Sequence, residues 1–340
     1  MYKLRDWIDI NKIHWNFLSL NPNAIDLLEK NNDKIDWTKL SYNPNAIYIL
    51  SKNINKINWN ALSYNPNAIY LLEKKIDKLS NQSILSLFFS KNNKINWSGL
   101  TSNPNAIHLL EKNMDKIKWY ELSNELSRNP NAIDLLEKNY DKINWSLLSE
   151  NPNAIDLISK NIDKIHWDAL SRNPNAIDIL EKNMDKIDWY WLSSNPNAID
   201  LLSKNMDKIN WRMLSSNPNA IPLLEKNSDK ICLYTLSSNP NAIHIMSENN
   251  DKIDWRLLSR NPNAIHIISK NIDKINNRYW IILSSNPSIF EIDYEALEKR
   301  CNIYKEELIK KALHPSIIKR YLNHPYLKDK DLDYILDNCF

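Results

Sequence analysis

The stretch NPNAIYILSKNINKINWNALSY, residues 43–64, contains the signals that decide the fold. Asn43 precedes a proline, which directs it towards the extended backbone angles that an N-cap residue needs. Pro44 then takes the first helical position, where its missing N–H is no loss, and the apolar residues after it fall on one side of a helix. Asn53 is expected to end this helix in the left-handed conformation, and Asn58 to cap a second helix. The stretch therefore predicts a helix of about ten residues followed by one of about six.

The Asn-Pro pair returns along the chain, with proline at 22, 44, 66, 104, 130, 152, 174, 196, 218, 240, 262 and 287. Eight of the eleven steps span 22 residues. One longer step contains a degenerate repeat at 79–96, another an insertion at 121–128, and the last extra residues within 276–282. Helices this short are marginal alone in water, so they must stack on their neighbours. We predict an all-α solenoid of about thirteen 22-residue helix-pair repeats with atypical capping ends.

The ends of the chain depart from the repeat pattern. Residues 1–14 are predicted to form a partial repeat that caps the first full one, and residues 15–290 to form the solenoid. Residues 291–340 read as longer amphipathic helices, broken near Pro315 and Pro325. We expect this segment to be a helical C-terminal cap over an apolar face left open at the end of the array.

Two constant features of the repeats are interpreted as structural. Tryptophan recurs in one register, at 15, 37, 59, 97, 119, 145, 167, 189, 211 and 255. A row of indoles could stack on sugars or bases, but a leucine follows three residues later throughout, which favours a core seam. The repeated asparagines are assigned to capping and to hydrogen bonds between units.

Composition excludes several classes of function. A formal net charge of +3 is too small to indicate nucleic acid or an anionic membrane surface, and no apolar run is long enough to span a membrane. A single glycine, Gly99, leaves no glycine-rich phosphate loop. Cys232, Cys301 and Cys339 are widely spaced and show no disulfide framework or metal spacing. With no catalytic constellation either, we expect no enzyme, no cofactor and no metal site.

The units LSSNPNAIHIM (236–246), LSRNPNAIDILEKNMDKIDW (170–189) and LSYNPNAIYLLEKK (62–75) carry a family resemblance. They are similar to the NPNAI-type 22-residue repeats in proteins of giant DNA viruses related to mimiviruses, over roughly residues 8–290. The resemblance implies a viral protein made in the host cytoplasm. It implies no activity and no functional residues.

The variable positions should carry recognition, because the constant ones build the array. Tyrosine and arginine, which are frequent at binding hot spots, recur one and five residues after the tryptophan register. We define the partner surface by seven of these residues: Tyr42, Tyr64, Tyr190, Arg212, Tyr234, Arg256 and Arg260. A secondary candidate, the acidic stripe, follows the shared isoleucine in four successive repeats: Asp134, Asp156, Asp178 and Asp200. A solvated face is the simpler interpretation of that stripe.

These patterns favour a non-enzymatic scaffold for protein–protein interaction, expected as a monomer. Binding of single-stranded RNA is the alternative, because lysines such as Lys164, Lys186 and Lys208 also repeat and could follow a phosphate backbone. A purely structural assembly is the third possibility. The N-terminus lacks the apolar core of a signal peptide. We therefore expect an intracellular protein, in the host cytoplasm or the virion.

Overall fold

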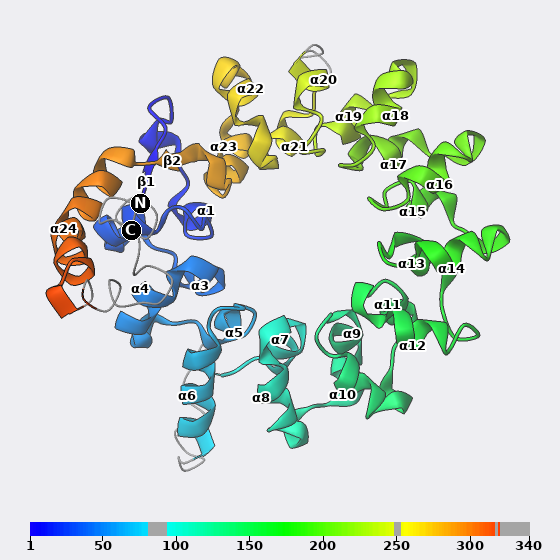
Figure 1. The fold of residues 1–340 in the computed structure, drawn as a ribbon, viewed down its shortest axis with the longest axis horizontal. Coiled ribbons are helices and arrows are strands. Elements are labelled where there is room, and N and C mark those ends of the chain that lie inside the picture. The colour runs from blue at the N-terminus through cyan, green and yellow to red at the C-terminus, as the bar shows by residue number, and fades with distance from the viewer. Residues whose placement is uncertain (81–93, 248–252, 317–318, 320–340) are drawn as a thin grey trace. The chain divides into compact units, whose positions relative to one another are not determined.

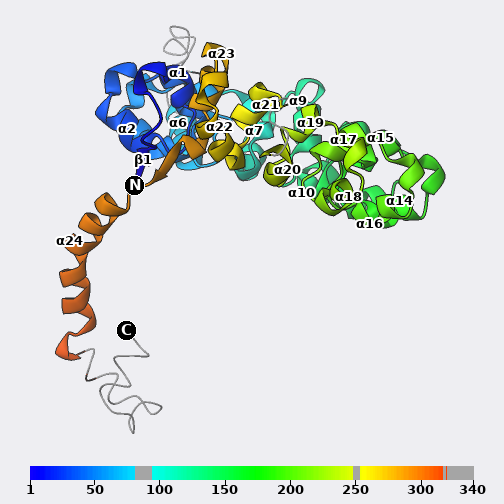
Figure 2. The same cartoon turned by 90° about the horizontal axis from the view of Figure 1, so that it is seen from above.

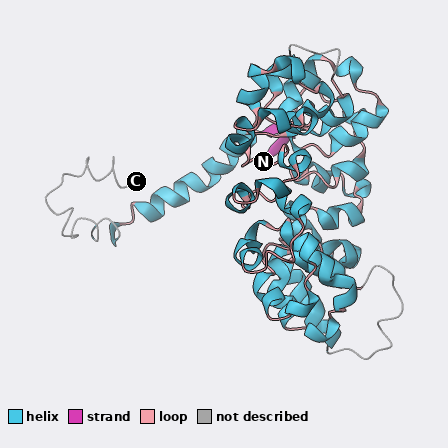
Figure 3. Cartoon of the chain, turned by 90° about the vertical axis from the view of Figure 1, so that its right-hand side faces the viewer, coloured by secondary structure: helices cyan, strands magenta, loops and turns pink. Residues whose placement is uncertain are grey.

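The computed structural model describes residues 1–80, 94–247, 253–316 and 319. The chain forms two compact units, one of residues 4–290 and the other of residues 1–3 and 291–340. Unit 4–290 is built from helices (Figure 3), in pairs that pack one after another along the chain. The predicted all-α repeat solenoid is confirmed.

Each repeat has a short helix near its tryptophan and a second helix that begins at the shared isoleucine. In Figure 1 the short helices follow the inner side of the array and the second helices its outer side, and Figure 2 shows α14, α16 and α18 on one side of α15, α17 and α19. The short helices are α1 (Trp15–Leu18), α3 (Trp37–Tyr42), α5 (Trp59–Leu62), α7 (Trp97–Ser102), α9 (Trp119–Arg128), α11 (Trp145–Ser149), α13 (Trp167–Arg172), α15 (Trp189–Leu192), α17 (Trp211–Ser216), α19 (Leu233–Leu236), α21 (Trp255–Arg260) and α23 (Asn277–Ser284). The second helices are α2 (Ile25–Lys30), α4 (Ile47–Lys52), α6 (Ile69–Ser80), α8 (Ile107–Glu111), α10 (Ile133–Glu137), α12 (Ile155–Ser159), α14 (Ile177–Glu181), α16 (Ile199–Ser203), α18 (Ile221–Lys226), α20 (Ile243–Ser247) and α22 (Ile265–Lys270).

The unit 43–64 confirms the predicted caps and corrects the predicted stop. The Asn43 side chain accepts a hydrogen bond from the Asn45 N–H, and the Asn58 side chain accepts one from Ala61. The long helix is divided into a 3₁₀ turn, Pro44–Ala46, and α4. Asn53 is not left-handed, since its φ is −125° and its ψ is 48°. Its amide Nδ2 instead donates to the Ile49 carbonyl at 2.9 Å, which satisfies a free carbonyl at the end of α4.

The first asparagine of each Asn-Pro-Asn motif holds two repeats together. The Nδ2 of Asn43 donates to the carbonyls of Ser19 at 3.1 Å and Asn21 at 2.9 Å, both in the preceding repeat. Its Oδ1 accepts the N–H of Asn45, and Nδ2 of Asn45 donates to the Pro22 carbonyl. The amide is fully buried with all three bonds made, so the motif repeats because each unit must bond its predecessor.

Within the described residues, twelve asparagines donate in this way, and we call this series the asparagine ladder. Its members are Asn21, Asn43, Asn65, Asn103, Asn129, Asn151, Asn173, Asn195, Asn217, Asn239, Asn261 and Asn286. Asn103 bonds the carbonyls of Ser63 and Asn65 directly, at 3.2 and 3.0 Å. The predicted degenerate repeat at 79–96 therefore adds no member to the ladder, which has twelve repeats where the sequence predicted about thirteen. Residues 81–93 of that segment lie outside the described residues.

The ladder closes on itself. The Nδ2 of Asn21, in the first repeat, donates to the carbonyls of Ser284 at 3.1 Å and Asn286 at 2.8 Å, in the last repeat. The N–H of His14 donates to Ser284 Oγ at 3.0 Å, just as Asp36 N–H donates to Ser19 Oγ within the array. The described residues between 4 and 290 thus form a closed ring of helix pairs (Figure 1).

Closure of the ring changes the position that was expected for the C-terminal cap. The segment 291–340 was expected to cover an apolar face left open after the last repeat, but the first repeat occupies that position. Strand β1 (Tyr2–Leu4) pairs with β2 (Phe290–Ile292) in a two-stranded sheet. Helix α24 (Tyr294–Ala312) follows.

The tryptophan register is a packing seam, but it lies at the edge of the core. Trp59 and Trp280 are buried, and the others are partly buried against the core leucines and isoleucines. In most repeats a lysine of the following repeat covers the indole ring, at 4.4 to 5.4 Å from its centre: Lys34 on Trp15, Lys56 on Trp37, Lys75 on Trp59, Lys164 on Trp145, Lys186 on Trp167, Lys208 on Trp189 and Lys230 on Trp211. Lys12 lies over Trp280 in the same way across the closure, at 5.7 Å.

Insertions lengthen the short helices and leave the ladder intact. The four extra residues within 121–128 extend α9 to ten residues. The extra residues within 276–282 move the last tryptophan to Trp280, whose carbonyl accepts a bond from Ser284 as that of Trp167 does from Ser171. Sequence spacing alone missed Trp280 for this reason.

Candidate functional site

All seven residues of the partner surface are exposed, and all belong to short helices or to the residues that follow them. They therefore lie on the inner row of helices in Figure 1. The residues form two groups in the chain, Tyr42 and Tyr64 on α3 and after α5, and the remaining five between α15 and α21.

Tyr42 and Tyr64 come from adjacent repeats and contact each other. Their ring centres are 5.7 Å apart at an interplanar angle of 40°, and both rings are about two-fifths exposed. Nδ2 of Asn96 donates to the Tyr64 hydroxyl at 3.4 Å. The single glycine makes room for this ring, because a Cβ at Gly99 would stand 2.8 Å from Cε2 of Tyr64.

The second group is an arc of tyrosine and arginine over α15, α17, α19 and α21. Arg256 Nη2 donates to the Tyr234 hydroxyl at 3.2 Å, which joins neighbouring repeats. Arg212 lies on α17 between Tyr190 and Tyr234 in repeat order. None of the arginines at 212, 256 and 260 forms an ion pair with a described residue. The arc therefore offers uncompensated positive charge beside aromatic rings.

Two residues next to this arc were not assigned from the sequence. The guanidinium of Arg172 lies over the indole of Trp191 at 3.4 Å and its Nη1 is 3.9 Å from Glu150 Oε1. Trp191 also meets Tyr190 edge to face, with centres 4.9 Å apart. Trp191 stands two places after the register tryptophan, and a second tryptophan in the same short helix was the available signal.

Cys232 is the helix N-cap in the one repeat whose register tryptophan is replaced by leucine. Partial burial acts to raise the pKa of the Cys232 thiol, but hydrogen bonds from Thr235 and the charge of Arg212 outweigh it and lower the pKa below its ordinary value. The thiol is half-buried and unpaired with another cysteine among the described residues.

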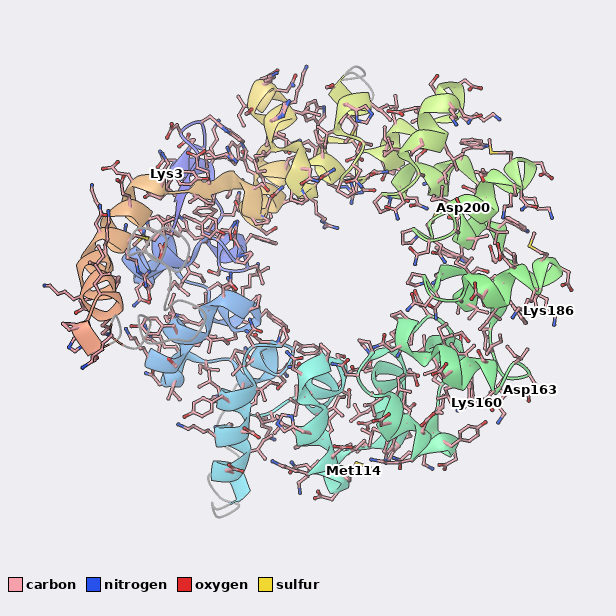
Figure 4. The ribbon with its side chains drawn as sticks, viewed as in Figure 1. Lys3, Met114, Lys160, Asp163, Lys186 and Asp200 are labelled. Atoms are coloured by element: carbon pink, nitrogen blue, oxygen red, sulfur yellow. The ribbon has the colours of Figure 1, made fainter. Side chains whose placement is uncertain are left out.

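The acidic stripe lies on the other row of helices. Asp134, Asp156, Asp178 and Asp200 are exposed, at the start of α10, α12, α14 and α16. None of the four pairs with a described lysine or arginine. Figure 4 labels Asp200, the member of the stripe on α16. The stripe and the partner surface are thus separate regions.

His108 and His244, which both follow the shared isoleucine of their repeats, do not form a shared site. His244 Nε2 is 2.9 Å from Glu225 Oε1, and His108 Nε2 is 3.1 Å from Glu73 Oε1. In the described part of the chain, no three histidine, cysteine, aspartate or glutamate side chains are grouped as a metal site would require. No described helix is both long and apolar enough to cross a membrane.

The lysines considered for phosphate contacts are engaged with aromatic rings. Lys186 and Lys208 cover Trp167 and Trp189, and Lys164 lies 4.4 Å from the centre of the Tyr140 ring as well as over Trp145.

Comparison with protein-family models, with curated proteins and with solved structures found no match.

Proposed function

We propose that this protein is a non-enzymatic scaffold that binds another protein through the inner row of helices. The observation that carries the proposal is the arc from Tyr190 to Arg260. Its side chains are exposed and differ between repeats, whereas the constant side chains are occupied by the ladder and the core. Tyrosine and arginine provide large contact areas and directed hydrogen bonds, and they are enriched at hot spots.

The charge of the arc indicates the chemistry of the partner. Arg212, Arg256 and Arg260 lack carboxylate partners among the described residues. An acidic protein segment would supply those carboxylates, and bidentate pairs with arginine are among the stronger charged hydrogen bonds. We therefore propose a partner with a negatively charged, partly aromatic binding segment.

Two alternatives fit less well. RNA binding along the array would need lysines free for phosphates, whereas those at 164, 186 and 208 cover aromatic rings. No binding to RNA at low salt would end that alternative, and a steep loss of RNA affinity with added salt would favour it.

End-to-end assembly would need free repeat faces, whereas the first and last repeats bond each other. The resemblance of the repeats supports a viral protein that acts in the host cytoplasm or the virion.

Charge reversal at Arg212, Arg256 and Arg260 to glutamate is expected to weaken capture of the partner at least tenfold, since each is an exposed contact of the hot-spot type. The midpoint of thermal unfolding should stay unchanged, because none of the three supports the core. The measurement is affinity purification from transfected or infected cells, followed by mass spectrometry against the unmodified protein.

The matched control is Lys160, Lys182 and Lys204 to glutamate, which makes the same change in charge on exposed residues that follow outer helices. A specific partner should be lost with the arginine variant and kept with the lysine variant. Equal recovery with both variants would remove the arc as the binding surface.

A further inference from the structure

Helix α24 carries an apolar stripe with no apolar partner among the described residues. Tyr294, Leu297, Cys301 and Tyr304 follow one another at steps of three, four and three residues, so they share one side of the helix. Tyr294 is 72% exposed, Leu297 38% and Tyr304 51%, and the free Cys301 is also exposed. Alternating steps of three and four are the spacing of helices that pair in coiled coils.

The surface along this stripe is hollowed. An open hollow of about 450 Å³ is lined, among the described residues, by Cys301, Tyr304, Glu307 and Lys311. Cys301 and Tyr304 belong to the stripe, and Lys311 follows Tyr304 by seven residues on the same side of the helix. Glu307 lies beside the stripe. A side chain from a second helix would have a place to enter, as knobs enter holes in paired helices.

We propose that α24 pairs in antiparallel orientation with α24 of a second copy of this chain. The charges that flank the stripe carry the choice of occupant. Glu298 and Arg300 lie beside its first half, and Lys305 and Glu307 beside its second half. When Cys301 packs against Tyr304 of the second copy, Arg300 faces Glu307 and Glu298 faces Lys305 of that copy. Twofold symmetry makes each attraction occur twice.

The same charges disfavour a parallel pair. Residues on the two edges of parallel helices meet five positions apart. Arg300 would then face Lys305 of the second copy, and Asp293 would face Glu298. Both contacts join like charges, so the sequence of α24 distinguishes the two orientations.

The four flanking charges are available for this contact. Within the described residues, none of Glu298, Arg300, Lys305 and Glu307 forms an ion pair. By contrast, Lys299 lies away from the stripe and pairs within its own helix, with Nζ 2.6 Å from Glu295 Oε1. All four flanking residues are exposed.

The pairing differs from the monomer expected from the sequence, and it stands independently of the proposed function. Helix α24 has 19 residues, fewer than the three to four heptads typical of a stable coiled coil. We therefore expect a reversible dimer with a Kd of roughly tens of micromolar, and monomer in the nanomolar range.

Sedimentation equilibrium of the full chain, with a reducing agent present, tests the pairing. The mass should rise towards twice the monomer mass as concentration passes through the tens of micromolar. Leu297→Asp should keep the mass at that of the monomer, with an unchanged circular dichroism spectrum because Leu297 is exposed. A full chain that stays monomeric throughout, for example because its own residues 317–340 cover the stripe, would overturn the proposal.

Charge variants test the orientation. Glu298→Lys should weaken dimerisation roughly tenfold, since two attractive pairs become repulsive and each reversal raises the dissociation constant about threefold. Adding Lys305→Glu should restore it. The matched control, Glu295→Lys with Lys299→Glu, exchanges charges away from the stripe and should have no effect. Stronger dimerisation of Glu298→Lys would indicate a parallel pair. An unchanged dissociation constant would show that the interface lies elsewhere on the chain. Either result overturns the proposal.

Discussion

Replacing Asn173 with alanine is expected to lower the free energy of unfolding by about 3 to 5 kcal/mol. The Asn173 amide is fully buried, and its Nδ2 donates to the carbonyls of Ser149 at 3.0 Å and Asn151 at 2.8 Å. Its Oδ1 accepts the N–H of Asn175 at 3.0 Å. Alanine would leave the two buried carbonyls and the Asn175 N–H without their side-chain partner. Urea titration followed by two spectroscopic probes measures the loss.

The second asparagine of the same motif provides the control. Asn175 is exposed, and its Nδ2 donates one hydrogen bond, to the Pro152 carbonyl at 3.0 Å. Asn175→Ala should cost only about 0.5 kcal/mol, because water can replace that bond. Similar costs for the two variants would contradict the assignment of the ladder as the main polar contact between repeats.

Asn21→Ala is expected to destabilise the protein by about as much as Asn173→Ala, roughly 3 to 5 kcal/mol. Asn21 is the first member of the ladder and has no preceding repeat in the chain. In the ring it is nonetheless fully buried, and it donates to Ser284 and Asn286 across the closure. Urea titration under the same conditions as for Asn173→Ala gives the comparison.

The size of the Asn21 effect separates a ring from an open array. At the start of an open solenoid the Asn21 amide would face water, and its loss would cost no more than an N-cap, about 1 kcal/mol. The matched variant Asn23→Ala removes an amide bond to the Pro287 carbonyl, and this should have a small effect in either case. A small loss of unfolding free energy for both Asn21→Ala and Asn23→Ala would indicate an open array.

Much of the fold could be predicted because each repeat solves the same local problem. Asparagine before proline favours an N-cap, and the side chain of Asn43 caps the 3₁₀ turn that leads into α4. The left-handed stop at Asn53 was wrong because an asparagine side chain can close a helix end itself, by donating to a carbonyl four residues back. Sequence pattern indicates that such a residue ends a helix, but it does not determine by which bond.

Ring closure could not be predicted from the sequence. Whether an array closes depends on a small rotation between neighbours, summed over every repeat. The direct bond from Asn103 to Asn65 also changes the number of repeats in that sum. Neither the rotation between repeats nor their exact number can be determined from a sequence motif. Together they bring the two ends of the array close enough for the Arg5 N–H to donate to the Ile289 carbonyl at 3.0 Å.

The partner surface was predicted from variability and residue type. The structure places its residues on one row of helices and brings Tyr42 onto Tyr64 and Arg256 onto Tyr234. It also adds Arg172 and Trp191, whose contact joins two repeats. That contact could not be anticipated because it depends on which side chains meet across an interface.

A distance between the first and last repeats tests the closed ring most directly. Spin labels would be placed at Asn16, on α1, and Arg278, on α23, which are exposed on helices that pack together. Cys232, Cys301 and Cys339 would first be replaced by serine. Neighbouring helices lie about 8–10 Å apart, so pulsed electron spin resonance should give one narrow distance below about 25 Å once the label linkers are included. A broad distribution centred at several tens of ångströms would show an open array and contradict the closed ladder.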